Sequence, residues 1–142
     1  MARVLESVLM PFEASKIYEI VNDVGSYAEF LPWCVGSRVI EEDDESMRAS
    51  ITIRKGGFSY SLITNNRLNF GRAISLEFSE GPFKYLKGAW SFVPTESGCK
   101  VKLELDFEAE NKLLDIALNA ASKPVAMTLM RSFRKRAYEL LG

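Results

Sequence analysis

The feature that most constrains the fold is a change of hydrophobic period near residue 110. Over residues 35–109, apolar and polar residues alternate with a period of two, which is typical of strands with one dry face. The clearest of these runs has as its inward positions Val101, Leu103, Leu105 and Phe107. After Asn111 the period becomes that of a helix. A chain with this order has to pack a long helix against a sheet.

Turn residues divide the alternating stretch into separate strands. Asn69-Phe70-Gly71, Gly81-Pro82 and Glu96-Ser97-Gly98 separate apolar runs at hairpin-like spacing. A further run over residues 2–10 comes before them and ends at Pro11, which cannot donate to a strand ladder. We therefore expect about seven strands in one antiparallel meander.

Two short helices are expected between the first strand and the meander. The apolar positions of the first helix recur at i, i+3, i+4 and i+7, and they are Ile17, Ile20, Val21 and Val24. Gly25 is a suitable end for this helix. Ser26 and Glu29 have the spacing of a capping box for a second short helix, which should stop before Pro32.

The long C-terminal helix should begin after Asn111, a good N-cap. Its inward stripe has 4-3-4-3 spacing and consists of Ala126, Met130, Phe133, Ala137 and Leu140. Pro124 cannot donate to the carbonyl four residues earlier, so we expect a kink or a division there, with Ser122 capping the restarted helix. The fold class is therefore α+β, with one curved antiparallel sheet wrapped around a long helix.

Composition excludes several classes of enzyme. The 142 residues suit a single domain over residues 1–142 and contain no histidine, which excludes serine-histidine hydrolases and histidine-ligated zinc sites. Cys34 and Cys99 are far apart and are expected to be reduced thiols. The net charge of −1 argues against a DNA-binding protein. We find no converging carboxylates and no phosphate-binding loop, so we expect no catalytic residue, no metal site and no required cofactor.

Several longer motifs resemble a known family. They are Asn22-Asp23-Val24, Phe30-Leu31-Pro32-Trp33-Cys34, Gly81-Pro82-Phe83-Lys84 and Asp106-Phe107-Glu108. These motifs and the order of elements resemble the START-like, or helix-grip, superfamily that includes polyketide cyclases. Within it, they resemble the family of the bacterial ribosome-association toxin RatA and the mitochondrial coenzyme Q-binding proteins. The resemblance covers nearly the whole chain.

The resemblance implies a non-catalytic hydrophobic pocket between helix and sheet. Such a pocket would hold ubiquinone or a similar polyprenyl lipid, and the protein would support respiratory quinone function as a carrier or chaperone. For bacterial members the family also implies binding to the large ribosomal subunit and a block of subunit association. A polyketide cyclase-like enzyme is a remote alternative. Because no run is long enough to span a bilayer, we expect a cytoplasmic bacterial protein, with peripheral contact to the inner membrane as an option.

Large apolar side chains at inward positions are the candidate pocket wall. Those from the strands and the helix are Phe58, Tyr60, Phe78, Trp90, Phe92, Met130 and Phe133. The same pattern is typical of a packed core, and periodicity does not distinguish a core from a lined cavity. The pocket hypothesis therefore depends on the resemblance.

Two local segments are candidates for the pocket entrance. Phe30 and Trp33 lie in a short turn, where they would form either a lid over the pocket or a plug at the end of the sheet. Phe83 and Lys84 follow a turn, and they form either an ordinary hairpin or an entrance loop. In the second case Phe83 would contact a lipid tail, and Lys84 a headgroup or a membrane phosphate.

The C-terminal helix is basic. The last twenty residues have a net charge of +4, and the candidate contact residues are Arg131, Arg134 and Lys135. This face would bind ribosomal RNA or an anionic membrane surface. The alternative is a solvated helix face whose cations complement the helix dipole.

Overall fold

The computed structural model describes residues 2–55 and 57–142, and it confirms the expected order of elements. The strands are β1 (Ala2–Met10), β2 (Cys34–Glu42), β3 (Ser46–Lys55), β4 (Phe58–Asn69), β5 (Ala73–Glu80), β6 (Phe83–Thr95) and β7 (Gly98–Ala109). The helices are α1 (Ala14–Asn22), the 3-10 turn η1 (Val24–Ser26), α2 (Tyr27–Phe30) and α3 (Lys112–Leu141).

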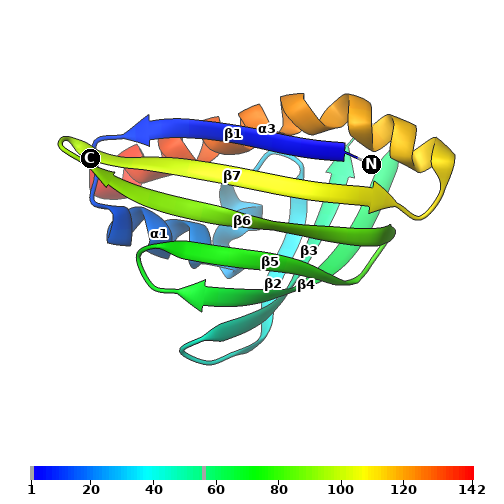
Figure 1. The fold of residues 1–142 in the computed structure, drawn as a ribbon, viewed down its shortest axis with the longest axis horizontal. Coiled ribbons are helices and arrows are strands. Elements are labelled where there is room, and N and C mark those ends of the chain that lie inside the picture. Colours follow the sequence, from blue (N-terminus) through cyan, green and yellow to red (C-terminus); the bar gives the residue numbers. More distant parts are fainter. Residues whose placement is uncertain (1, 56) are drawn as a thin grey trace.

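All seven strands form one antiparallel sheet in the order β1-β7-β6-β5-β4-β3-β2. The sheet is strongly curved, and α3 runs along its inner side behind β1 and β7, while α1 lies at one end (Figure 1). The sequence-based prediction of an α+β fold with a curved sheet around a long helix is therefore confirmed.

Two glycines permit close backbone contacts between neighbouring strands of the sheet. A Cβ atom on Gly88 of β6 would lie 2.1 Å from the backbone oxygen of Glu104 on β7. A Cβ atom on Gly98 would lie 2.0 Å from the backbone oxygen of Met10, and Gly98 has a φ of 156°. Both positions therefore need a residue without a side chain.

The second half of α3 is packed into a filled core. Phe133 is 1% exposed, and its ring meets those of Tyr27, Phe30 and Trp90 edge-on, each with centroids 5.3 Å apart. Met130, Phe133 and Ala137 belong to the same buried cluster as residues of α1 and the sheet. The prediction is wrong for the last residue of the inward stripe, because Leu140 is 55% exposed.

The structure differs from the predicted helix ends at two places. The first helix ends at Asn22, earlier than expected, and Val24 lies buried in η1. The capping box is wrong, because the Ser26 hydroxyl donates to the Asp23 carboxylate (2.7 Å) and makes no cap hydrogen bond to α2. The tight η1 turn before α2 brings the Asp23 carboxylate within hydrogen-bond distance of the Ser26 hydroxyl.

The cap of α3 is confirmed, and its division at Pro124 is wrong. Asn111 Oδ1 accepts a hydrogen bond from the backbone N–H of Leu114 at 2.9 Å. A single helix continues through Pro124, and the Ser122 hydroxyl donates to the Asn119 carbonyl at 2.9 Å instead of capping a new helix. Among the described residues, no helix is long and apolar enough to span a membrane.

Candidate ligand-binding site

A cavity of about 260 Å³ lies between the first half of α3 and the inner face of the sheet. Residues of β1, β3, β4, β5, β6 and β7 line it on one side. On the other side it is lined by the helix residues Leu118, Ala121, Ser122, Val125, Ala126 and Leu129. Ligand sites in proteins usually have volumes of about 300–1,000 Å³, so this cavity suits a compact molecule or one end of a long one.

Small side chains on α3 leave this space open. The second half of the helix places the large side chains of Met130 and Phe133 against the sheet. The first half instead has the small side chains of Ala121, Ser122 and Ala126 facing the sheet. The second half of the helix therefore packs in the main core, whereas the first half packs in a smaller cluster with Val4 and Phe107 and leaves a hollow beside it. The local cause is side-chain size, because the helix itself is continuous.

The cavity wall is almost wholly apolar. None of the described residues that line it is Asp, Glu, Lys or Arg. Thr64 and Asn66 of β4 are its buried polar pair, and the Thr64 hydroxyl donates to Asn66 Oδ1 at 2.8 Å. The Tyr27 hydroxyl donates to the Val21 carbonyl, and burial raises the pKa of this phenol well above its ordinary value.

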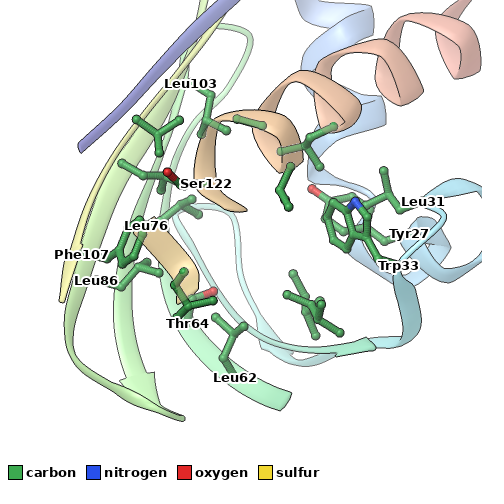
Figure 2. Close-up of a pocket in the computed structure, with 18 of the residues that line it drawn as sticks. Tyr27, Leu31, Trp33, Leu62, Thr64, Leu76, Leu86, Leu103, Phe107 and Ser122 are labelled. Atoms are coloured by element: carbon green, nitrogen blue, oxygen red, sulfur yellow. The ribbon is translucent and has the colours of Figure 1, made fainter. Parts of the chain in front are cut away.

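The two ends of the cavity differ. Tyr27, Leu31 and Trp33, from α2 and the segment after it, gather at one end, while Leu86 and Phe107 lie at the other (Figure 2). The backbone of Trp33 is tied to β3 because its carbonyl accepts from the Arg54 N–H at 2.8 Å. One end therefore contains a buried indole N–H without a partner among the described residues, and the other offers hydrocarbon surface.

Three of the residues proposed from the sequence line the cavity, namely Trp33, Phe83 and Trp90. Trp33 is 8% exposed, which places it in the wall. Phe30 lies outside the cavity, with the Arg136 guanidinium 5.0 Å above its ring. The two halves of the proposed lid are thus separated.

The other proposed aromatic and methionine residues whose side chains the structure describes do not line the cavity. Phe78 packs edge-on against Phe83 (5.7 Å), Phe92 packs against Tyr18 (5.5 Å), and Met130 and Phe133 lie in the filled core. Tyr60 is half-buried on β4 and does not line the cavity. The side chain of Phe58 lies outside the part of the chain that the structure describes.

The hairpin candidate Lys84 is exposed and lies 3.7 Å from the carboxylate of Glu108. It points away from the cavity lining, so the structure brings Phe83 but not Lys84 to the site. The sequence patterns did not lead to a prediction that aliphatic and small residues line the cavity. A usable signal was the inward spacing of Leu118, Ser122, Val125 and Leu129.

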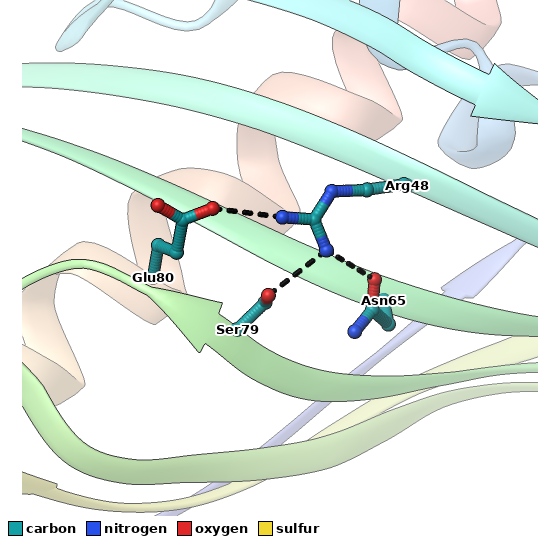
Figure 3. A network of polar contacts seen from close by, with 4 residues as sticks. All are labelled: Arg48, Asn65, Ser79 and Glu80. Atoms are coloured by element: carbon teal, nitrogen blue, oxygen red, sulfur yellow. Dashed lines mark hydrogen bonds and ion pairs between the residues drawn. The ribbon is translucent and has the colours of Figure 1, made fainter.

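A polar network on the outer face braces the sheet behind the cavity. Arg48 of β3 donates to Asn65 (3.0 Å), Ser79 (2.9 Å) and Glu80 (2.8 Å), as Figure 3 shows. The pairing of β4 with β5 shifts register between Ile63 and Thr64, which pair with Glu80 and Phe78. Ser79 is the residue left out of this pairing and forms a β-bulge beside Thr64. The hydrogen bond from Arg48 to Ser79 therefore holds this bulge.

The candidate basic surface consists of Arg131, Arg134 and Lys135, all exposed on the second half of α3. The Arg134 guanidinium lies 5.9 Å from the ring centroid of Tyr138. Arg136 is not part of this surface, because it is half-buried and pairs with Glu29 at 3.8 Å. The α3 residues that line the cavity end at Leu129, and this surface follows them from Arg131 to Lys135.

Comparison with known proteins identifies the family. Residues 10–134 match the family described as polyketide cyclase/dehydrase and lipid transport. Ribosome association toxin RatA from Vibrio cholerae is 38% identical over 143 residues, covering 100% of this chain and 99% of the relative. The mitochondrial coenzyme Q-binding protein coq10 from Schizosaccharomyces pombe is 27% identical over 140 residues, covering 92% and 84%.

A solved structure shows the same fold. The Zhui aromatase/cyclase from Streptomyces superposes with a TM-score of 0.90 over 99% of this chain and 95% of that protein, at 16% sequence identity. The resemblance to the START-like superfamily is thus confirmed from both sequence and structure. The chain belongs to the polyketide cyclase/dehydrase and lipid transport family, in which its relatives include the ribosome association toxins RatA.

Proposed function

We propose that this protein binds a neutral isoprenoid lipid of the quinone class in its cavity and carries it without chemical change. The observation on which this depends is an apolar cavity without a charged lining residue among those described. Burial of apolar surface contributes about 25 cal/mol per Å², so a prenyl chain can be held without an ionic contact. The name of the coq10 relative, a coenzyme Q-binding protein, supports the choice of ligand class.

The placement of acidic side chains supports a non-catalytic role. Asp106 and Glu108 alternate with Leu105 and Phe107 on β7, so they lie on the face of the sheet opposite the cavity. A general acid or base has to lie within hydrogen-bond reach of the reacting atom. The hydroxyls of Thr64 and Tyr27 at the cavity already donate to protein acceptors.

Mass spectrometry of an organic extract tests this function. The protein is purified without detergent from a quinone-producing bacterium, and we expect near-stoichiometric quinone. Ala121→Phe fills the cavity and should lower the quinone content at least tenfold, whereas Ala120→Phe adds the same ring on the exposed face and should not. An extract from the unmodified protein with no quinone would refute the proposal.

A second candidate function is docking on the large ribosomal subunit. It is favoured by the exposed Arg131, Arg134 and Lys135, and by relatives of 37–39% identity named ribosome association toxins. Contacts between such cations and RNA phosphates weaken steeply with salt. We propose that this basic surface, and not the cavity, makes the ribosome contact.

Charge reversal separates the two functions. Changing Arg131, Arg134 and Lys135 to Glu should abolish co-sedimentation with the large subunit and leave quinone content unchanged. The matched control reverses three exposed cations elsewhere, namely Arg67, Arg72 and Lys100. Equal loss of ribosome binding in both triple variants would show that net charge alone is responsible, and would contradict this docking surface.

A further inference from the structure

The indole N–H of Trp33 is a buried hydrogen-bond donor in the cavity wall that has no partner among the described residues. Trp33 is 8% exposed, and its Nε1 atom is buried without an acceptor among the described residues. An indole N–H can only donate. A buried donor left unpaired is costly, and such groups in native proteins are few and call for an explanation. The position of this one at an end of a cavity supplies a reason.

Most of the other polar groups along the cavity already make hydrogen bonds within the protein. The hydroxyls of Tyr27 and Ser122 donate to backbone carbonyls, and the Thr64 hydroxyl donates to Asn66 Oδ1. The amide nitrogen of Asn66 donates to no described residue. The uncommitted nitrogen atoms of Trp33 and Asn66 are therefore both donors, and a ligand that satisfies them has to supply acceptor oxygens.

The charge of the lining restricts the headgroup further. Because no Lys or Arg is among the described lining residues, a carboxylate or phosphate in the cavity would be a buried anion without a counter-charge. The cost of burying an unpaired charge is several times that of burying a neutral polar group. Free fatty acids and phospholipid headgroups are therefore poor matches, and a neutral carbonyl compound is a good one.

We infer that the Trp33 indole N–H binds a carbonyl oxygen of the ligand's headgroup, so that the headgroup lies at the Trp33 end and the apolar chain extends toward Leu86 and Phe107 (Figure 2). The amide of Asn66 is a second donor along the same cavity. Trp33 is well suited to this role because its backbone is fixed to β3 through Arg54. This assignment rests on the proposed function and specifies which end of the ligand is recognised.

Binding measurements on Trp33→Phe test the assignment. Phenylalanine keeps an aromatic ring and removes the N–H. The probes are a ubiquinone analogue with a decyl chain and a plain hydrocarbon, n-pentadecane, each titrated by displacement of Nile red from delipidated protein. We expect about tenfold weaker binding of the quinone by the variant and a change of less than twofold for the hydrocarbon.

Nuclear magnetic resonance of the unmodified protein gives an independent measurement, in which ligand binding by a Trp33 variant plays no part. The chain has only two tryptophans, so its ¹⁵N spectrum has two indole signals, which Trp90→Phe assigns. The quinone should move the Trp33 indole proton downfield, as expected for a new hydrogen bond, and the hydrocarbon should not.

The outcomes separate this assignment from the proposed function. If the unmodified protein binds the quinone, yet Trp33→Phe binds it equally well and the indole signal stays in place, the assignment is overturned and the carrier function stands. If the unmodified protein binds the hydrocarbon but not the quinone, the quinone-carrier function itself is overturned.

Discussion

Enlarging one alanine of α3 should make the protein more stable and less able to bind its ligand. Ala121 lines the cavity, and Ala121→Leu adds three carbon atoms there. Each occupies roughly the space of a water molecule, about 30 Å³, so together they fit within a cavity of about 260 Å³. The change therefore fills existing space and does not require the sheet to move.

The magnitude follows from the apolar surface that becomes buried. At about 0.8 kcal/mol for each buried carbon, less about 0.5 kcal/mol of side-chain entropy, the free energy of unfolding should rise by about 2 kcal/mol. For a chain of this size that is an increase in Tm of about 6 °C. Leucine and alanine both favour helices, so propensity contributes little.

Thermal unfolding followed by circular dichroism measures this effect. Both proteins have to be delipidated, because a bound ligand would stabilise the unmodified protein and hide the gain. Ala120→Leu is the control, since Ala120 is exposed on the neighbouring face of the same turn, and we expect its Tm to change little. If Ala121→Leu instead lowers stability by about 1–3 kcal/mol, as overpacking does, the space is already filled and the cavity argument fails.

Three further predictions concern the sheet and the thiols. Gly88→Ala should destabilise the protein by about 2–3 kcal/mol in urea unfolding, because its Cβ would meet backbone at 2.1 Å, whereas Gly25→Ala, with nothing within 4 Å, should have little effect. Arg48→Met removes the three hydrogen bonds at the β4–β5 bulge and should cost about 1 kcal/mol, measured in the same assay; an unchanged midpoint would mean that the network does not hold the bulge. Burial raises the pKa of Cys34 and Cys99 above the ordinary value of 9.0, so both should react with Ellman's reagent far more slowly in native than in unfolded protein. Because the pKa of each thiol is higher in the folded than in the unfolded protein, the stability contributed by the two neutral thiols is complete below pH 9 and is lost as pH rises. A Tm that rises through this range would contradict this prediction.

Period and turn chemistry were sufficient to predict the architecture. Alternation along Val101–Phe107 and the helical stripe after Asn111 depend on local geometry, because one face of each element has to be dry. The capping box at Ser26 was wrong because a local acceptor three residues earlier, the Asp23 carboxylate, takes the serine hydroxyl. The division at Pro124 was wrong because α3 continues through that residue as one helix.

The cavity could be predicted only in part, since emptiness is a property of several elements together. Aromatic residues such as Phe92 and Phe133 were predicted to line the pocket because of their size, yet in the structure they fill the core. The cavity depends on small side chains. An alanine at an inward position has the same periodic pattern whether it lines a cavity or is closely packed. Among large residues, Trp33 and Trp90 do reach the cavity.

The two halves of α3 make stability and binding separable in this fold. Removing side-chain volume to make a cavity normally costs stability in proportion to the empty space. Here the loss is confined to the half with Ala121 and Ala126, while Phe133 in the other half is 1% exposed and contacts three aromatic rings. The filled half therefore fixes the helix on the sheet through Met130, Phe133 and Ala137, none of which lines the cavity. Variants in the first half should change affinity with little loss of stability, and variants in the second should do the reverse.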